Sequence, residues 1–123
     1  MNIEQDAAGR ALLATVVQLA LTDACLAPIK RREEGGLPMQ CDAFTAMRFF
    51  FDTRVAGLNE YAMWLDINPE RVRRRLLEMM VDDSPKIVNG FDTIRRRNMR
   101  QNYDLWRRMR NAEAAVTEED DND

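Results

Sequence analysis

The chain has 123 residues, of which 46% are hydrophobic and 32% are charged, and its formal net charge at pH 7 is -3. That composition supplies a small apolar core and excludes a wholly disordered chain. There is no histidine, and the only 2 cysteines are Cys25 and Cys41. Histidine is the commonest general base and metal ligand, so we expect no enzymatic activity, no metal and no cofactor. We expect one soluble, cytoplasmic domain whose cysteines are packed thiols.

Charge is unevenly distributed along the chain. Residues 112–123 carry 6 acidic side chains and no basic one, so the remaining 15 of the 21 acidic side chains stand against all 18 basic ones in the rest of the chain. The net negative charge therefore does not exclude a polyanionic partner. We predict that residues 112–123 form a disordered acidic tail.

The N-terminal part begins with residues 1–9, which we predict to be a flexible lead-in. In residues 10–27 apolar side chains cover most of a helical wheel, which predicts a helix. A helix that is apolar on all sides is normally buried in a core or in a dimer seam, so this pattern also allows a homodimer. The charged segment 30–36 that follows predicts a solvated linker.

The next helix is predicted over residues 43–54, with Asp42 as its N-cap. Phe44, Met47 and Phe50 fall at spacings that converge on one face, which predicts a core-facing side rather than a ligand site. Helix-forming residues dominate the whole chain, and alternating apolar runs are absent. We therefore predict an all-α fold.

Within a helical domain over residues 10–81, the stretch 57–80 reads as two short helices across a tight turn. The first helix covers residues 58–65. Asn68 can cap the second helix, and Pro69 at its first position has a suitable φ. Such a pair indicates a helix-turn-helix, whose second helix enters the major groove of DNA.

This stretch resembles the helix-turn-helix superfamily. The residues that carry the resemblance are Ala62, Leu65 and Ile67 around the turn, with Val72 and Leu76 in the second helix. The family usually has glycine in the turn where this chain has Asp66.

The run WLDINPERVRRRLLEMM, preceded by an aromatic helix, also loosely resembles small uncharacterised proteins of alphaproteobacterial phages and prophages. Together the two resemblances imply a DNA-binding protein of phage or prophage type, either a transcription regulator or a DNA-packaging accessory. The alternative is an interaction protein that binds and modulates a host protein without touching DNA, because a fold does not decide a function.

The second helix of this pair has an apolar stripe and a basic outward side. The stripe consists of Val72, Leu76, Met79 and Met80. The predicted contacts with DNA are Arg71 and Arg74 to base edges, and Arg73 and Arg75 to phosphates. Glu70 and Glu78 lie four residues from Arg74 on either side, so an ordinary solvated helix with ion pairs is the alternative.

Residues 82–111 predict a connector and an arginine-rich helix capped by Asp92. The stripe that would dock this helix on the body is Ile94, Leu105 and Met109, with Met99 and Trp106 towards its edge. The predicted contacts with nucleic acid are Arg96, Arg97, Arg100, Tyr103 and Arg107. Arginine pairs bidentately with phosphate, so double-stranded DNA is the predicted partner. The alternatives are RNA, an acidic protein partner, and the acidic tail of the same chain.

Overall fold

The computed structural model describes residues 3–27 and 42–121, with side chains from 7–27 and 42–114. The predicted linker at 30–36 and Cys41 lie outside these residues. The described part folds into five helices, namely α1 (Ile3–Ala24), α2 (Asp42–Phe51), α3 (Leu58–Leu65), α4 (Pro69–Val81) and α5 (Thr93–Asp121). It contains no strand, only an isolated bridge between Val88 and Phe91. The predicted all-α fold is confirmed.

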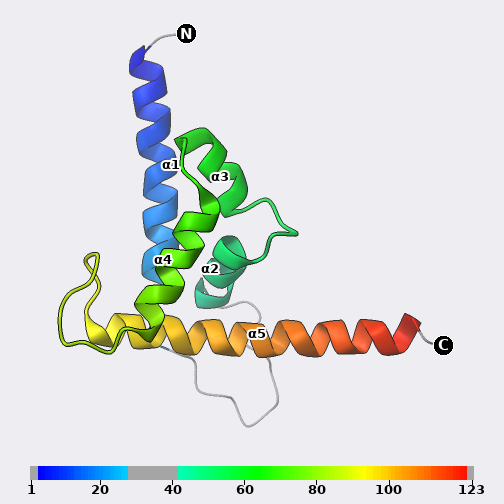
Figure 1. Ribbon diagram of the computed structural model, residues 1–123. Coiled ribbons are helices and arrows are strands. Elements are labelled where there is room, and N and C mark those ends of the chain that lie inside the picture. Colours follow the sequence, from blue (N-terminus) through cyan, green and yellow to red (C-terminus); the bar gives the residue numbers. More distant parts are fainter. Residues whose placement is uncertain (1–2, 28–41, 122–123) are drawn as a thin grey trace.

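The two long helices, α1 and α5, meet near the C-terminal end of α1, and the three short helices fill the corner between them (Figure 1). The N-terminal half of α1 and the C-terminal half of α5 extend beyond this corner (Figure 1). None of the helices in the described part of the chain combines the length and the apolar character needed to cross a membrane.

The core lies where all five helices converge, and its centre comes from α2 and α4. Met47 and Phe50 of α2 are 0% and 1% exposed, and Met79 of α4 is 2% exposed. The core-facing sides that the sequence predicted for α2 and for α4 are therefore confirmed. The other buried apolar side chains of the core are Ala24, Cys25, Phe44, Ala46, Leu58, Leu76, Met80, Met99 and Trp106.

Helix α1 differs from the prediction at its start and in its burial. It begins at Ile3, so the predicted start at residue 10 is wrong. Leu12 and Leu19 are 67% and 60% exposed, whereas full burial sets in only at Ala24 and Cys25. The predicted burial of this helix in the core of its own chain is thus wrong along most of its length, because the small body covers only one side of α1. A dimer seam on the uncovered side stays a prediction.

The chain between α2 and α3 is shaped by two local contacts. Asp52 accepts the main-chain N–H of Arg54 at 3.0 Å, which forms a turn and ends α2 at Phe51, three residues before the predicted end. At Gly57 a Cβ atom would lie 2.5 Å from the main-chain oxygen of Phe49, so only glycine allows α3 to start this close to α2.

In the α3–turn–α4 unit, α3 has the predicted bounds, and α4 begins at Pro69 as predicted and ends at Val81, one residue beyond the predicted unit. Asp66 adopts the left-handed conformation with φ 56° and ψ 46°, in the place where glycine is usual. The side chain of Asn68 accepts the N–H groups of Glu70 and Arg71 at 3.0 and 3.4 Å, which confirms it as the N-cap of α4. Ala62 is 1% exposed at the close approach of the helices.

Between α4 and α5 the chain makes a tight hairpin. Val88 and Phe91 exchange main-chain hydrogen bonds of 3.0 Å across Asn89 and Gly90, whose φ values are both positive. Asp92 then accepts the N–H of Arg95 at 2.9 Å, which confirms its predicted role as the cap of α5.

Helix α5 continues to Asp121, so the predicted disordered tail is wrong. The physical reason lies in the residues that follow Arg110, which are largely alanine and glutamate, both strong helix formers. Extending an existing helix also requires no new nucleation, so a segment that would be marginal alone can stay helical.

Candidate nucleic-acid interface

Arg71 and Arg74 lie on the outward side of α4, as predicted. Both are exposed, and neither guanidinium has an ion pair or hydrogen bond to another residue in the described part of the chain. The two glutamates of α4 pair with other arginines: Glu70 with Arg73, and Glu78 with Arg75 at 3.1 Å. The expected ion pairs of Arg74 are therefore absent among the described residues, and α4 presents two unpaired guanidiniums.

Arg73 is not available to a phosphate, so this predicted contact is wrong. The residue is 8% exposed. Its Nε donates to the main-chain oxygen of Phe50 at 2.7 Å, and its two terminal nitrogens donate to Glu70 and Asn59. A helical wheel places Arg73 at the flank of α4, but α2 and α3 close over that flank. Arg73 therefore ties three helices together.

Arg75 remains half-exposed, with 49% of its side chain accessible. Besides pairing with Glu78, it lies beside the Asn89 amide, whose oxygen accepts from Nε at 2.8 Å in the orientation that satisfies both groups. It could still reach a phosphate, but only by exchanging these partners.

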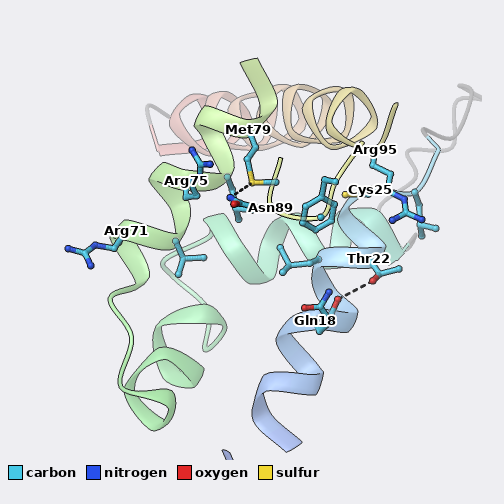
Figure 2. Close-up of a pocket in the computed structure, with 14 residues that line it drawn as sticks. Gln18, Thr22, Cys25, Arg71, Arg75, Met79, Asn89 and Arg95 are labelled. Carbon is cyan, nitrogen blue, oxygen red and sulfur yellow. Dashed lines mark hydrogen bonds between the residues drawn. The ribbon is translucent and has the colours of Figure 1, made fainter. Parts of the chain in front are cut away.

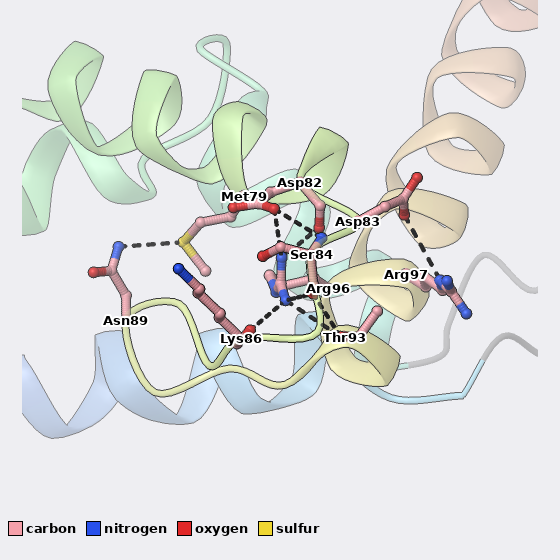
Figure 3. Close-up of polar contacts among 9 residues, drawn as sticks. All are labelled: Met79, Asp82, Asp83, Ser84, Lys86, Asn89, Thr93, Arg96 and Arg97. Atoms are coloured by element: carbon pink, nitrogen blue, oxygen red, sulfur yellow. Dashed lines mark hydrogen bonds and ion pairs between the residues drawn. The ribbon is translucent and has the colours of Figure 1, made fainter.

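Arg96 is also a structural residue rather than a nucleic-acid contact. It is 0% exposed and enclosed by the loop between α4 and α5 (Figure 3). Its guanidinium donates to the main-chain oxygens of Ser84 at 2.8 Å, Lys86 at 2.7 Å and Asp82, and lies 3.4 Å from the Asp82 carboxylate. The predicted contact is wrong because the loop folds back over this turn of α5, which no helical wheel can show.

The face of α5 that docks on the body is shifted from the prediction, because Met99 and Trp106, which the prediction placed at the edge of the stripe, are its most buried residues. Ile94 is 67% exposed, whereas Met99 and Trp106 are 1% and 8% exposed. The predicted stripe is therefore wrong at Ile94, and Leu105 and Met109 are only half-buried at its edge.

Two amides of α5 that sequence reasoning missed hold the end of α1. Asn102 donates to the main-chain oxygens of Ala24 and Leu26 at 3.0 and 2.9 Å, and Asn98 donates to that of Cys25 at 3.2 Å. These bonds satisfy carbonyls that the end of α1 leaves without helical partners. They also set the position of α5 against α1.

The exposed side of α5 carries a basic face, which we define as Arg97, Arg100, Arg107 and Arg108. The Nε of Arg97 lies 3.7 Å from Oδ1 of Asp83, and both side chains are exposed. Arg107 lies over the ring of Tyr103, with 5.6 Å between the guanidinium carbon and the ring centroid. Arg108 was missed as a contact, although its position eleven residues after Arg97 places it on the same side of the helix.

The ring of Tyr103 packs beside this basic face. Its ring centroid lies 4.7 Å from that of Phe51 and 6.2 Å from that of Trp106, and Arg107 lies over the ring. The residue is half-buried. The ring is thus engaged on these sides, and the predicted contact of Tyr103 with nucleic acid stays a prediction.

The acidic residues beyond Arg110 continue the same helix away from the body (Figure 1). A helix rises about 1.5 Å per residue, so residue 120 lies about 18 Å along the axis from residue 108. The acidic end cannot fold back on the basic face while this helix is intact. The alternative in which the acidic tail occupies its own basic helix is therefore contradicted.

The described part of the chain is thus all-α and carries exposed guanidiniums on α4 and on the basic face of α5. No protein-family model, curated protein or solved structure matches the chain. The assignment of a function therefore rests on the side chains described above.

Proposed function

We propose that the protein binds double-stranded DNA through α3 and α4 used as a helix-turn-helix, as a transcription regulator or a DNA-packaging accessory. The observation that carries the proposal is the pair of exposed guanidiniums of Arg71 and Arg74 in the first turns of α4, which have no partner among the described side chains. In helix-turn-helix proteins the N-terminal residues of the second helix contact base edges. The proposal includes a cytoplasmic location, where cellular DNA is accessible, and no catalysis.

The basic face of α5 supplies phosphate contacts in this proposal. Each arginine that neutralises a phosphate releases counterions, so it adds about 0.9 to the slope of log affinity against log salt on duplex DNA. The buried Arg73 and Arg96 contribute nothing to this slope. Helix α4 then determines sequence preference, and α5 contributes affinity that is independent of sequence.

The test measures fluorescence anisotropy of the full chain with duplex DNA over a series of salt concentrations. Arg100→Ala should lower the salt slope by about 1 and weaken binding equally on all sequences. Arg71→Ala or Arg74→Ala should instead change which genomic fragments are selected. Arg10→Ala is the matched control, because it removes one exposed charge from α1, which belongs neither to α4 nor to the basic face of α5.

Absence of duplex binding at low salt would overturn the proposal. So would an equal loss of affinity in Arg10→Ala and Arg100→Ala, because binding would then follow net charge alone. Preferential binding of single-stranded RNA over duplex would replace DNA by RNA as the partner.

A protein-binding role is the second candidate, and one specific observation favours it. Met63 and Trp64 of α3 are 73% and 63% exposed, and Ile67 of the turn is 41% exposed. Clustered exposed apolar side chains that include a tryptophan are typical of protein interfaces. In this role Trp64→Ser should abolish binding of a host protein that co-purifies with the chain. The DNA-binding role predicts that the same variant keeps its duplex affinity.

A further inference from the structure

A cavity of about 680 Å³ lies between α1 and α4, next to the hairpin that precedes α5 (Figure 2). Sites for small organic ligands usually measure about 300–1,000 Å³. No arginine of the basic face of α5 lines this cavity, whereas Arg71 and Arg75 of α4, two of the proposed DNA contacts, do.

The walls of this cavity combine an apolar surface with positive charge. The apolar part comes from Leu21 of α1, Val72 and Leu76 of α4, and Phe91 of the hairpin. Three arginines, Arg71, Arg75 and Arg95, also line it, and no acidic side chain does so in the described part of the chain. Such a lining favours a ligand with an apolar body and a negative group.

The three arginines are not equivalent. The guanidinium of Arg71 points away from the cavity, outward from α4 (Figure 2). Arg75 is engaged by Glu78 at 3.1 Å. Arg95 has no ion pair or side-chain hydrogen bond among the described residues, and Asp92 at its helix end accepts only its main-chain N–H. Arg95 therefore offers the free positive charge.

Cys25 lies near Arg95, at the same end of the cavity. Burial raises the pKa of the Cys25 thiol to about 11, and the nearby Arg95 charge opposes this increase, while Asp92 adds to it. The thiol is therefore neutral at pH 7 and does not repel an anion next to Arg95. Figure 2 shows Cys25 and Arg95 on the side of the cavity opposite Arg75.

We propose that this cavity binds an amphipathic monoanion, an apolar chain or ring that ends in one carboxylate or sulfonate. The acid group pairs with Arg95 beside Cys25. The apolar part lies against Leu21, Leu76 and Phe91, where it leaves water. A guanidinium pairs strongly with a carboxylate, and the apolar walls supply affinity that is independent of charge. This inference is independent of DNA binding.

The test uses isothermal titration calorimetry of the full chain with decanoate below its micelle concentration. Decanol and decyltrimethylammonium are the neutral and cationic comparisons. Decanoate should bind with one molecule per chain and more tightly than either comparison. Arg95→Gln should weaken decanoate about ten-fold and leave decanol nearly unchanged, because only the charged contact is lost. Arg108→Gln removes the same charge outside the cavity and should have no effect.

Two further measurements distinguish binding in this cavity from binding elsewhere on the surface. Gln18→Trp, at an exposed position of the cavity rim, should block both decanoate and decanol while the unfolding curve stays that of a folded protein. In a Cys41→Ser background, saturating decanoate should slow the reaction of Cys25 with a maleimide several-fold. Equal binding of the three amphiphiles, equal effects of Arg95→Gln and Arg108→Gln, or an unchanged Cys25 rate would each overturn the proposal.

Discussion

A guanidinium carries five N–H donors, and at Arg96 three main-chain carbonyls of the α4–α5 loop accept from it. Arg100 lies one helical turn further along and has none of these partners. The same residue type therefore has two different environments within one turn of α5, a structural one inside the molecule and an exposed one on its surface, where the proposed function gives Arg100 a phosphate contact. The difference comes from the loop that covers the first residue and not the second.

Replacing Arg96 should lower the free energy of unfolding far more than replacing Arg100. Arg96→Met leaves buried carbonyls without donors and should lower the free energy of unfolding by about 3 kcal/mol. Arg100→Met should change it by less than about 0.5 kcal/mol, as is usual for exposed positions. Urea denaturation of the two variants measures the difference. Equal effects would show that the loop does not depend on Arg96.

Asp52 should make stability dependent on pH in the acid range. Its carboxylate is 4% exposed and accepts from Nε and a terminal nitrogen of Arg54 at 3.0 and 3.1 Å. These hydrogen bonds lower the pKa of Asp52 to about 2 from its usual 3.8, although burial acts in the opposite direction. Because the folded pKa is the lower one, the stabilisation is fully present above about pH 4 and is lost as the pH falls toward 2.

The variant Asp52→Asn should remove this dependence. Between pH 6 and pH 3 the wild-type protein should lose on the order of 1 kcal/mol more stability than the variant, a value reduced for the solvent exposure of Arg54. Urea unfolding at the two pH values measures this difference. Parallel losses in both proteins would contradict the role given to Asp52.

At the scale of elements, the α3–turn–α4 unit depends on one residue with a positive φ. The left-handed conformation costs an L-residue roughly 1 kcal/mol, less for aspartate than for most others. Here Asp66 takes it, and the N–H of Ile67 reaches the main-chain oxygen of Ala62 at 3.0 Å. A tight turn that glycine would form most easily thus forms with aspartate, at some cost in stability.

Asp66→Gly should therefore raise the free energy of unfolding, by about 0.5 kcal/mol, and leave the turn unchanged. Asp66→Val should lower it by about 1–2 kcal/mol, because a β-branched residue resists this conformation. Asp83→Gly is the control, since Asp83 is exposed and its φ is not positive. Thermal unfolding of the three variants should show a gain only for Asp66→Gly.

At the scale of the whole molecule, α1 and α5 each pack on the short helices along one part of their length and are joined to each other near the C-terminal end of α1. The main-chain oxygens at the end of α1 accept from Asn98 and Asn102 of α5, and Ala24 and Cys25 enter the core there. The opposite ends of both helices extend beyond the body (Figure 1). Local stability should therefore fall along each helix with distance from this junction.

Hydrogen exchange followed by mass spectrometry should resolve this gradient. Amides of residues 3–16 should exchange much faster than those of α2 and α4, because few buried contacts support the first half of α1. The experiment should be run at two protein concentrations. Protection of residues 3–16 at low concentration would contradict the gradient, whereas protection only at high concentration would indicate that a second copy covers α1.

The sequence by itself determined what depends on near neighbours in the chain. Asn68 and Asp92 cap their helices, Pro69 starts α4, and the spacing of Phe44, Met47 and Phe50 orients α2. Each of these effects acts within a few residues, so a local pattern is enough to predict it.

Only the tertiary structure decided which side chains are covered. Arg73 and Arg96 are buried and Leu12 and Ile94 are exposed, against the expectation from their helical wheels. A wheel gives the direction of a side chain from its own helix, but burial depends on which distant element packs there. The closing of α2, α3 and the α4–α5 loop over two arginines is such a long-range event. It reduced the candidate interface to Arg71 and Arg74 with half-exposed Arg75 on α4, together with the basic face of α5 and the half-buried Tyr103 beside it.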